Sequence, residues 1–148
     1  IKREERGLKT ASDALMNVPV GLPPLMRAEK VQKKAANVGF DWSSAREALP
    51  KIREEADELL AELIAGRDPT EETGDLLFSC VNVARLAGVE AETALMRANE
   101  KFIRRFKAME NAIKLDGKAI EDLTLSEMDV YWNRNKQCPS NTSGLCQY

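Results

Sequence analysis

The chain has 148 residues, of which 43% are hydrophobic and 31% are charged, and its formal net charge is −2. This size and composition are typical of one soluble, helix-rich domain with a single core. A charge so close to zero gives no general case for nucleic acid or a membrane surface as partner. No apolar run approaches the roughly 20 residues that a transmembrane helix needs.

The ends of the chain and its cysteines carry little chemistry. The first residues, "IKREERGLK", are charged and do not resemble a signal peptide, and the missing initiator Met suggests a fragment or an excised domain. Cys80, Cys138 and Cys146 form no zinc-like spacing. Cys80 lies in an apolar run and is expected to be a reduced core residue, which favours a cytoplasmic location.

Two segments make up the first third of the sequence. Residues 1–24 combine charged residues with the turn-rich "NVPVGLPP" and are expected to be a linker leading into the domain. From about residue 25 to 37, apolar and small side chains recur at helical spacing, with cations on the other faces. Within that helix, Lys30, Lys33 and Lys34 form a cationic stretch, for which solvated surface is the favoured interpretation.

A long second helix is expected from about residue 44 to 65. Gly39 permits a turn before it, and Asp41, Ser43 or Ser44 could cap its start. Pro50 falls in its first turns, so the start could also lie nearer Leu49. The sequence "GRDP" at 66–69 should end it.

Three further helices complete an all-α fold of four to five helices. They are expected at about 70–88, with Thr70 near a capped start, at 91–115, and at 125–136 with Ser126 as a possible cap. No segment alternates with period two for long enough to predict a strand. The tail at 137–148 has the composition of a disordered or non-native end.

Carboxylates follow two of these helices along the edge of the expected core. On the second helix, Glu55, Glu58 and Glu62 share one side at i, i+3, i+7 spacing and flank the buried stripe, with Glu54 turned further toward water. Asp57 lies on the opposite, solvent side. Like charges repel there, so these acids need an explanation.

The third helix is apolar around most of its circumference between residues 76 and 86 and should be buried nearly all round. Its one polar strip contains Glu72, Asp75, Ser79 and Asn82. If this strip faces the second helix, about four negative charges converge, which would cost several kcal/mol without compensation.

Three arrangements would relieve this repulsion: protonation, ion pairs or a bound metal. Protonating several acids near neutral pH requires pKa shifts at the limit of what burial achieves. Oxygen ligands without His or Cys fit Mg²⁺ or Mn²⁺, and such clusters serve phosphate substrates. A solvated Glu-rich face remains an alternative for 54–62, and pairing with Lys33, Lys34, Lys101 or Arg105 is an alternative for the whole set.

The runs "EEADE" and "EETGD" match the EExxE…ExxD signature of MazG-type nucleoside triphosphate pyrophosphohydrolases. "LPPLMRAEKVQKKAANVGFDW", "GDLLFSCVNVARLAG" and "NEKFIRRF" also resemble the C-terminal domain of bacterial MazG. The resemblance covers about residues 19–136 and makes 1–18 similar to the linker between the two MazG domains. It implies an all-α bundle that works as a homodimer on nucleoside triphosphates (NTPs) with relaxed base preference.

The resemblance also implies residue roles, position by position. Metal binding falls to Glu55, Glu58, Glu72 and Asp75, and water activation or support to Glu54 and Glu71. "NEKFIRRF" implies that Lys101 and Arg105 contact phosphate and assist catalysis, and "YWNRNK" implies that Trp132 and Lys136 bind nucleotide.

The residues and the resemblance together predict a Mg²⁺-dependent hydrolase that converts NTP and water to monophosphate and pyrophosphate. Phe40 and Trp42 could stack a base or anchor their loop to the core. Two other functions stay open. One is a non-catalytic helical dimerisation or regulatory module, and the other is the same fold acting on dUTP/dCTP or phosphoribosyl-ATP.

Overall fold

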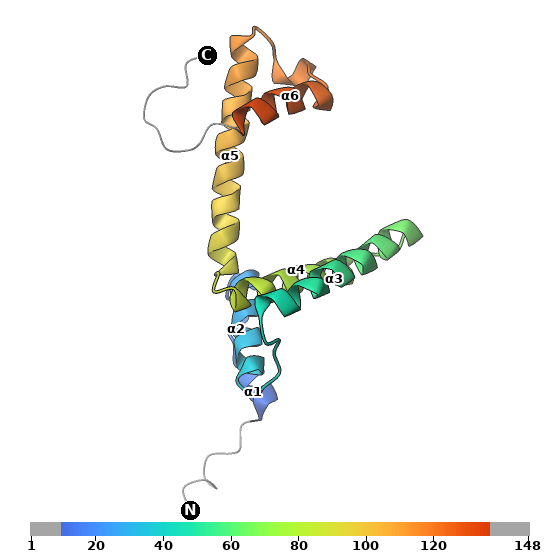
Figure 1. The fold of residues 1–148 in the computed structure, drawn as a ribbon, viewed down its shortest axis with the longest axis vertical. Helices are drawn as coiled ribbons and strands as arrows, with labels where there is room; N and C mark the ends of the chain where they lie inside the picture. Colours follow the sequence, from blue (N-terminus) through green and yellow to red (C-terminus); the bar gives the residue numbers. More distant parts are fainter. Residues whose placement is uncertain (1–9, 137–148) are drawn as a thin grey trace, which may run out of the picture. The chain divides into compact units, whose positions relative to one another are not determined.

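The computed structural model describes residues 10–136 (Figure 1). Within them, the backbone is helical and contains no strand, so the predicted all-α class is confirmed. None of the described helices is both long and apolar enough to cross a bilayer. The elements are α1 (Ala11–Met16), α2 (Pro24–Ala36), α3 (Ala45–Ala65), α4 (Thr70–Leu86), α5 (Ala91–Leu115), the 3-10 helix η1 (Ile120–Asp122) and α6 (Leu125–Asn135).

The chain divides into two units, the first ending at Leu95 and the second beginning at Met96, so that α5 contributes to both. In the first unit, α4 packs along α3 and against α2, and α1 packs against α2. Figure 1 shows α3 and α4 side by side over much of their length. Ala48 on α3 and Val81 on α4 are both buried, each only 1% exposed.

Helix α1 lies in the segment that is expected to be a linker, and the sequence pattern did not predict a helix there. The cause is a capping box, in which Thr10 accepts from the backbone of Asp13 and the Asp13 side chain accepts from the backbone of Thr10. Val18, just after α1, is only 4% exposed, so this segment packs against the unit. The domain limits of 1–18, 19–136 and 137–148 remain predictions.

Helix α3 begins at Ala45 because Ser44 caps it, and Pro50 is accommodated within its second turn. The start nearer Leu49 is therefore not observed. Gly66 ends the helix in the left-handed region with φ 67°, a conformation that costs glycine little.

The loop after α3 also determines where α4 begins. Asp68 accepts a hydrogen bond of 3.0 Å from the backbone nitrogen of Thr70, the first residue of α4. This carboxylate satisfies one of the free N–H groups at the start of the helix.

Helix α4 is not buried all round, contrary to the prediction. Val81 and Ser79 are buried, but Leu77 is 52% exposed, Phe78 is 43% exposed and Cys80 is exposed. The reason is that α2 and α3 cover only part of the circumference of α4 within its unit. Cys80 is consequently not a core residue, and Cys138 and Cys146 lie outside the described residues.

The second unit has its own small core, made by Met109, Ile113 and Tyr131. The Tyr131 hydroxyl donates a hydrogen bond of 2.6 Å to Asp116, and this bond is the main reason why the pKa of Tyr131 is raised. Helix α6 is capped by Thr124 through a capping box with Glu127, so the prediction of Ser126 as cap was wrong.

Candidate metal centre

Three carboxylates meet between α3 and α4. Oxygen atoms of Glu55, Glu58 and Glu72 all lie within 4.8 Å of one another. Glu55 and Glu58 are one turn apart on α3, and Glu72 comes from the first turn of α4. Glu55 is buried, Glu72 is half-buried and Glu58 is exposed, so the group is open to solvent on one side. We call these three residues the carboxylate cluster.

Two other acids from the sequence patterns lie outside the carboxylate cluster. Asp75 follows Glu72 on α4, but its side chain is exposed and is not within the same 4.8 Å group. Its role as a ligand therefore remains a prediction. Glu62 is held by Arg67 through two hydrogen bonds of 2.7 Å, which satisfy both of its oxygens away from the cluster.

Lys51 is the residue that sequence reasoning missed. Its Nζ atom lies 2.6 Å from Oε1 of Glu55 and 2.9 Å from Oε1 of Glu54, so one ammonium group connects two neighbouring carboxylates. The i, i+4 spacing of Lys51 and Glu55 was the available signal. Among the cations considered from the sequence, Lys33 instead pairs with Glu29, at 3.2 Å.

The pKa values of two cluster residues are shifted in opposite directions, that of Glu55 down and that of Glu58 up. The hydrogen bond from Lys51 lowers the pKa of Glu55 and outweighs the effect of burial. The pKa of Glu58 is raised, first because its protonated form is hydrogen-bonded to Glu55, and further by the charge of Glu55, by burial and by the charge of Glu72. The hydrogen bonds to Glu55 and Glu54 raise the pKa of Lys51, which keeps it protonated.

The cluster has the chemistry to hold a metal ion. The second oxygen of Glu55, Oε2, is buried and has no hydrogen-bond partner among the described residues. A buried acceptor left without a partner is costly, and a carboxylate oxygen in this position suits a hard divalent cation. Glu55, Glu58 and Glu72 together supply three oxygen donors and no nitrogen or sulfur, so the residues fit such an ion.

Each of the two candidate proton acceptors directly precedes a cluster residue in the sequence, Glu54 before Glu55 and Glu71 before Glu72. Glu54 is 58% exposed at its side chain and is held by Lys51. Glu71 is exposed in the first turn of α4. Both side chains are therefore accessible to water, as a proton acceptor for a water molecule must be.

The four candidate phosphate- and nucleotide-binding residues all belong to the second unit. Lys101 and Arg105 are one turn apart on α5, and Trp132 and Lys136 are one turn apart at the end of α6. The ring of Trp132 packs against that of Phe102, with 5.4 Å between centroids. Since Phe102 directly follows Lys101, the structure brings Trp132 close to the start of this cationic pair.

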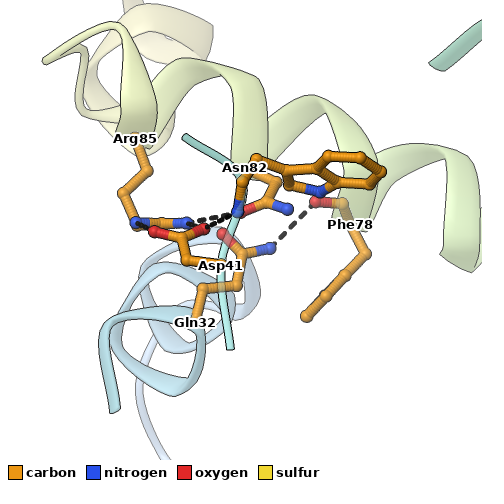
Figure 2. Close-up of polar contacts among 6 residues, drawn as sticks. Gln32, Asp41, Phe78, Asn82 and Arg85 are labelled. Atoms are coloured by element: carbon orange, nitrogen blue, oxygen red, sulfur yellow. Dashed lines mark hydrogen bonds and ion pairs between the residues drawn. The ribbon is translucent and has the colours of Figure 1, made fainter. Parts of the chain in front are cut away.

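A polar network fixes the loop between α2 and α3 to α4 (Figure 2). The Arg85 guanidinium donates to both oxygens of Asp41, at 3.0 and 2.5 Å, and to the side-chain oxygen of Asn82 at 2.6 Å. The hydrogen bonds from Arg85 lower the pKa of Asp41. Asp41 is thus the anchor of the loop, whereas Phe40 and Trp42, beside it, are 82% and 44% exposed.

Comparison with known proteins identifies the family. A family model described as the MazG nucleotide pyrophosphohydrolase domain matches residues 43–109, which include the whole carboxylate cluster. This chain carries a MazG domain. The predicted resemblance to the MazG family is confirmed, and the matched range contains α3, α4 and most of α5.

Curated relatives extend the similarity beyond the MazG domain's central helices. The chain is 43% identical over 141 residues to a nucleoside triphosphate pyrophosphohydrolase of Escherichia coli K12, covering 93% of this chain and 54% of that protein. It is 42% identical over 139 residues to the nucleoside triphosphate pyrophosphohydrolase/pyrophosphatase MazG of Thermotoga maritima, covering 92% and 52% respectively. The chain spans about half the length of these relatives.

A third relative matches less of the chain. The uncharacterized protein YabN of Bacillus subtilis is 46% identical over 66 residues, which is 45% of this chain and 14% of that protein.

Proposed function

We propose that this MazG domain is a Mg²⁺-dependent nucleoside triphosphate pyrophosphohydrolase with broad base tolerance, converting NTP and water to nucleoside monophosphate and pyrophosphate. The observation that carries the proposal is the carboxylate cluster, with its unpartnered buried oxygen on Glu55. The printed names of two relatives, both nucleoside triphosphate pyrophosphohydrolases, support the same reaction.

In this proposal, Glu55, Glu58 and Glu72 hold Mg²⁺, with Mn²⁺ as an alternative ion and Asp75 as a fourth ligand. When bound, the ion screens the negative charge of a triphosphate and lowers the pKa of a coordinated water. Lys51 fixes the rotamer of Glu55 by binding Oε1, which leaves the buried Oε2 available to the proposed ion. Lys51 therefore acts as a positioning residue.

The proton of the attacking water goes to Glu54 or Glu71, the two accessible acids that are not assigned to the metal. The water oxygen forms a bond to the α-phosphorus, the bond from that phosphorus to the bridging oxygen breaks, and pyrophosphate leaves. Of the two, Glu54 is the one whose side chain is held in place, because Lys51 lies 2.9 Å from its Oε1. Its exposure leaves its other oxygen free to accept the proton.

In this proposal, binding roles also fall to residues of the second unit. Lys101 and Arg105 offset the charge that develops on the leaving pyrophosphate, and Lys136 adds a further positive charge. Trp132, supported by Phe102, offers a ring face to the nucleotide.

The proposed enzyme is a homodimer in the cytoplasm. Large apolar side chains are exposed on α3, α4 and α5, including Leu63, Leu77 and Phe102 at 57%, 52% and 57%. Apolar surface of this kind is typical of an interface between subunits. Light scattering tests this point, since a monomer active at full rate would contradict it.

The test of the reaction is a product assay with Mg²⁺ and a panel of NTPs and dNTPs, with pyrophosphate and orthophosphate measured separately. Pyrophosphate as the product is expected, and orthophosphate would rule out the proposed bond cleavage. The panel also separates broad tolerance from a preference for dUTP or dCTP, and phosphoribosyl-ATP is added as a further substrate.

Matched variants test the site. Glu58→Gln and Asp75→Asn should each lose most pyrophosphate release, whereas Asp57→Asn, on the exposed face of α3, should retain it. Retained turnover in both site variants would contradict the assignment of the metal centre. The alternative, a dimerisation or regulatory module, predicts that the chain releases no pyrophosphate from any NTP. It also predicts that Mg²⁺ does not change the melting temperature.

A further inference from the structure

A pocket of about 480 Å³ in the first unit has three lysines in its wall. Its volume falls within the range of about 300–1,000 Å³ that is usual for small-molecule sites. Helix α2 contributes the three lysines, the turn after α1 contributes Val18 and Pro19, and Asn37 lies at the end of α2. None of the lining residues is acidic. We call this the lysine pocket, and its cations are Lys30, Lys33 and Lys34.

The lysine pocket lies on a different face of α2 from the one that packs on α4. Gln32 marks the packed face, because its amide nitrogen donates a hydrogen bond of 3.0 Å to the backbone oxygen of Phe78 on α4. Lys30 and Lys34 are each two residues from Gln32, which places them about 160° around the helix from it. The carboxylate cluster belongs to α3 and α4, so the lysine pocket is not part of the proposed metal centre.

Positive charge is concentrated on α2, although the whole chain is slightly acidic. The helix carries four basic residues and one acidic residue, a net charge of +3, in a chain whose net charge is −2. The one acid, Glu29, pairs with Lys33 at 3.2 Å. Helix α2 therefore has no further carboxylate to offer Lys30 and Lys34. A concave surface with an excess of one charge attracts small ions of the opposite charge.

The lysines are not needed to satisfy the carbonyl groups at the end of α2. The backbone nitrogen of Asn37 donates to the oxygen of Lys33 at 3.1 Å, that of Gly39 to Ala36 at 2.9 Å and that of Phe40 to Ala35 at 3.2 Å. These bonds are the usual way in which a chain turn satisfies the last carbonyls of a helix. The ammonium groups are therefore available to a ligand.

The wall opposite the lysines is formed before any ligand binds. Val18 is only 4% exposed, and its backbone nitrogen donates a hydrogen bond of 3.1 Å to the oxygen of Leu15. Pro19 follows with a φ that its ring restricts. Because this wall is already ordered, the entropy lost on binding is confined mostly to the lysine side chains. The sequence favours solvated surface for these lysines, and the structure adds a concave wall beside them.

We propose that the lysine pocket binds a chain of two or more phosphates, such as pyrophosphate, at a second site apart from the metal centre. Lys30 and Lys34 are one helical turn apart, with about 5–6 Å between their Cβ atoms, so their ammonium groups can contact different phosphates of one chain. The side-chain amide of Asn37 adds a neutral donor. This inference goes beyond the proposed hydrolysis and does not require it.

The spacing of the lysines selects for linked phosphates. Orthophosphate has only one phosphorus and cannot place a separate phosphate group against each ammonium group. Pyrophosphate should therefore bind about 3- to 10-fold more tightly, as one additional exposed ion pair predicts. Free pyrophosphate and the phosphate chain of a nucleotide share this chemistry, and ADP serves as the probe for the second source.

The test is an NMR titration of the full chain, labelled with ¹⁵N, in a chelator and at constant ionic strength. Pyrophosphate should shift the backbone amide signals of Val18 and Asn37. In the double variant Lys30→Gln/Lys34→Gln its affinity should fall about 3- to 30-fold, as the loss of two ion pairs predicts. The matched control, Lys107→Gln/Lys114→Gln, removes the same charge from α5 and should bind as the unaltered chain does.

A second double variant keeps the result independent of folding. Lys30→Arg/Lys34→Arg preserves both charges and should retain the shifts at Val18 and Asn37. The same shifts with ADP would support a phosphate chain from either source, and shifts with pyrophosphate alone would support the free anion as ligand.

Three results would overturn the proposal. The first is equal affinity of Lys30→Gln/Lys34→Gln and its control, and the second is orthophosphate binding as tightly as pyrophosphate. The third is a set of shifts at Lys101 and Arg105 without any at Val18 and Asn37. Because no metal or turnover is involved, these measurements stand even if the product assay rejects the proposed hydrolysis.

Discussion

Replacing Glu58 by Gln should have opposite effects on stability without and with Mg²⁺. The pKa of Glu58 is raised in the folded chain because of its hydrogen bond to Glu55, the charges of Glu55 and Glu72, and burial. A raised carboxyl pKa means that the folded state is favoured by protonation, so this contribution is present below the unfolded pKa of about 4.5 and is lost as pH rises. At pH 7 the ionised Glu58 therefore destabilises the metal-free fold, and Glu58→Gln should raise its melting temperature.

Mg²⁺ should reverse this order. An ion that binds only the folded state stabilises it by about 2.7 kcal/mol at one hundred times its dissociation constant. For a chain of 148 residues this corresponds to a rise in melting temperature of about 5 to 10 °C. Glu58→Gln removes one of the three clustered carboxylates and should show little or none of this rise.

The measurement is thermal unfolding by circular dichroism at pH 7, with a chelator and then with a Mg²⁺ series. Asp57→Asn is the matched control, because it removes an exposed carboxylate of the same helix outside the cluster. It should respond to Mg²⁺ as the unaltered chain does. A lower melting temperature of Glu58→Gln in chelator, or a full Mg²⁺ response in that variant, would refute the reasoning.

Three further predictions concern Lys51, the loop residue Asp41 and the core residue Ile113. Lys51→Met should lower kcat more than it raises KM and should raise the pKa of Glu55, measured by NMR titration; an unchanged Glu55 pKa would contradict the pairing. The pKa of Asp41 is lowered, so its stabilising contribution is present above the unfolded value of 3.8 and is lost as pH falls further. Asp41→Asn should therefore be less stable than the unaltered chain at pH 7 and no less stable near pH 2, as urea unfolding would show. Ile113→Ala should lower the free energy of unfolding of its unit by about 2–5 kcal/mol, against a change within about 0.5 kcal/mol for the exposed Leu115→Ala.

The carboxylate cluster was predictable because helical spacing alone determines much of it. Glu55 and Glu58 share a face at i, i+3, and the polar strip of an otherwise apolar helix had to turn toward a neighbour. Lys51 was not predicted, although it precedes Glu55 by four residues and therefore lies one helical turn away from it. Asp75 shows the limit of the same method, since a helical wheel gives a direction but not the distance that separates an exposed side chain from the cluster.

Other differences arise from information that short patterns do not contain. Helix α1 depends on the reciprocal bonds of Thr10 and Asp13, a signal that was hidden in a turn-rich segment. The exposure of Cys80 could not be read from its apolar surroundings, because it depends on which neighbours cover α4. The hydrogen bond from Gln32 to Phe78 joins residues 46 positions apart, and only the packing of α2 on α4 reveals it.

Lys51 gives the cluster a counter-ion of its own. Its ammonium group already neutralises part of the negative charge on Glu54 and Glu55, so the helices can pack before any ion arrives. A dication bound as proposed would join a partly balanced site and compete with a tethered positive charge. The length of one lysine side chain would thereby help to determine the affinity of the cluster for the proposed ion.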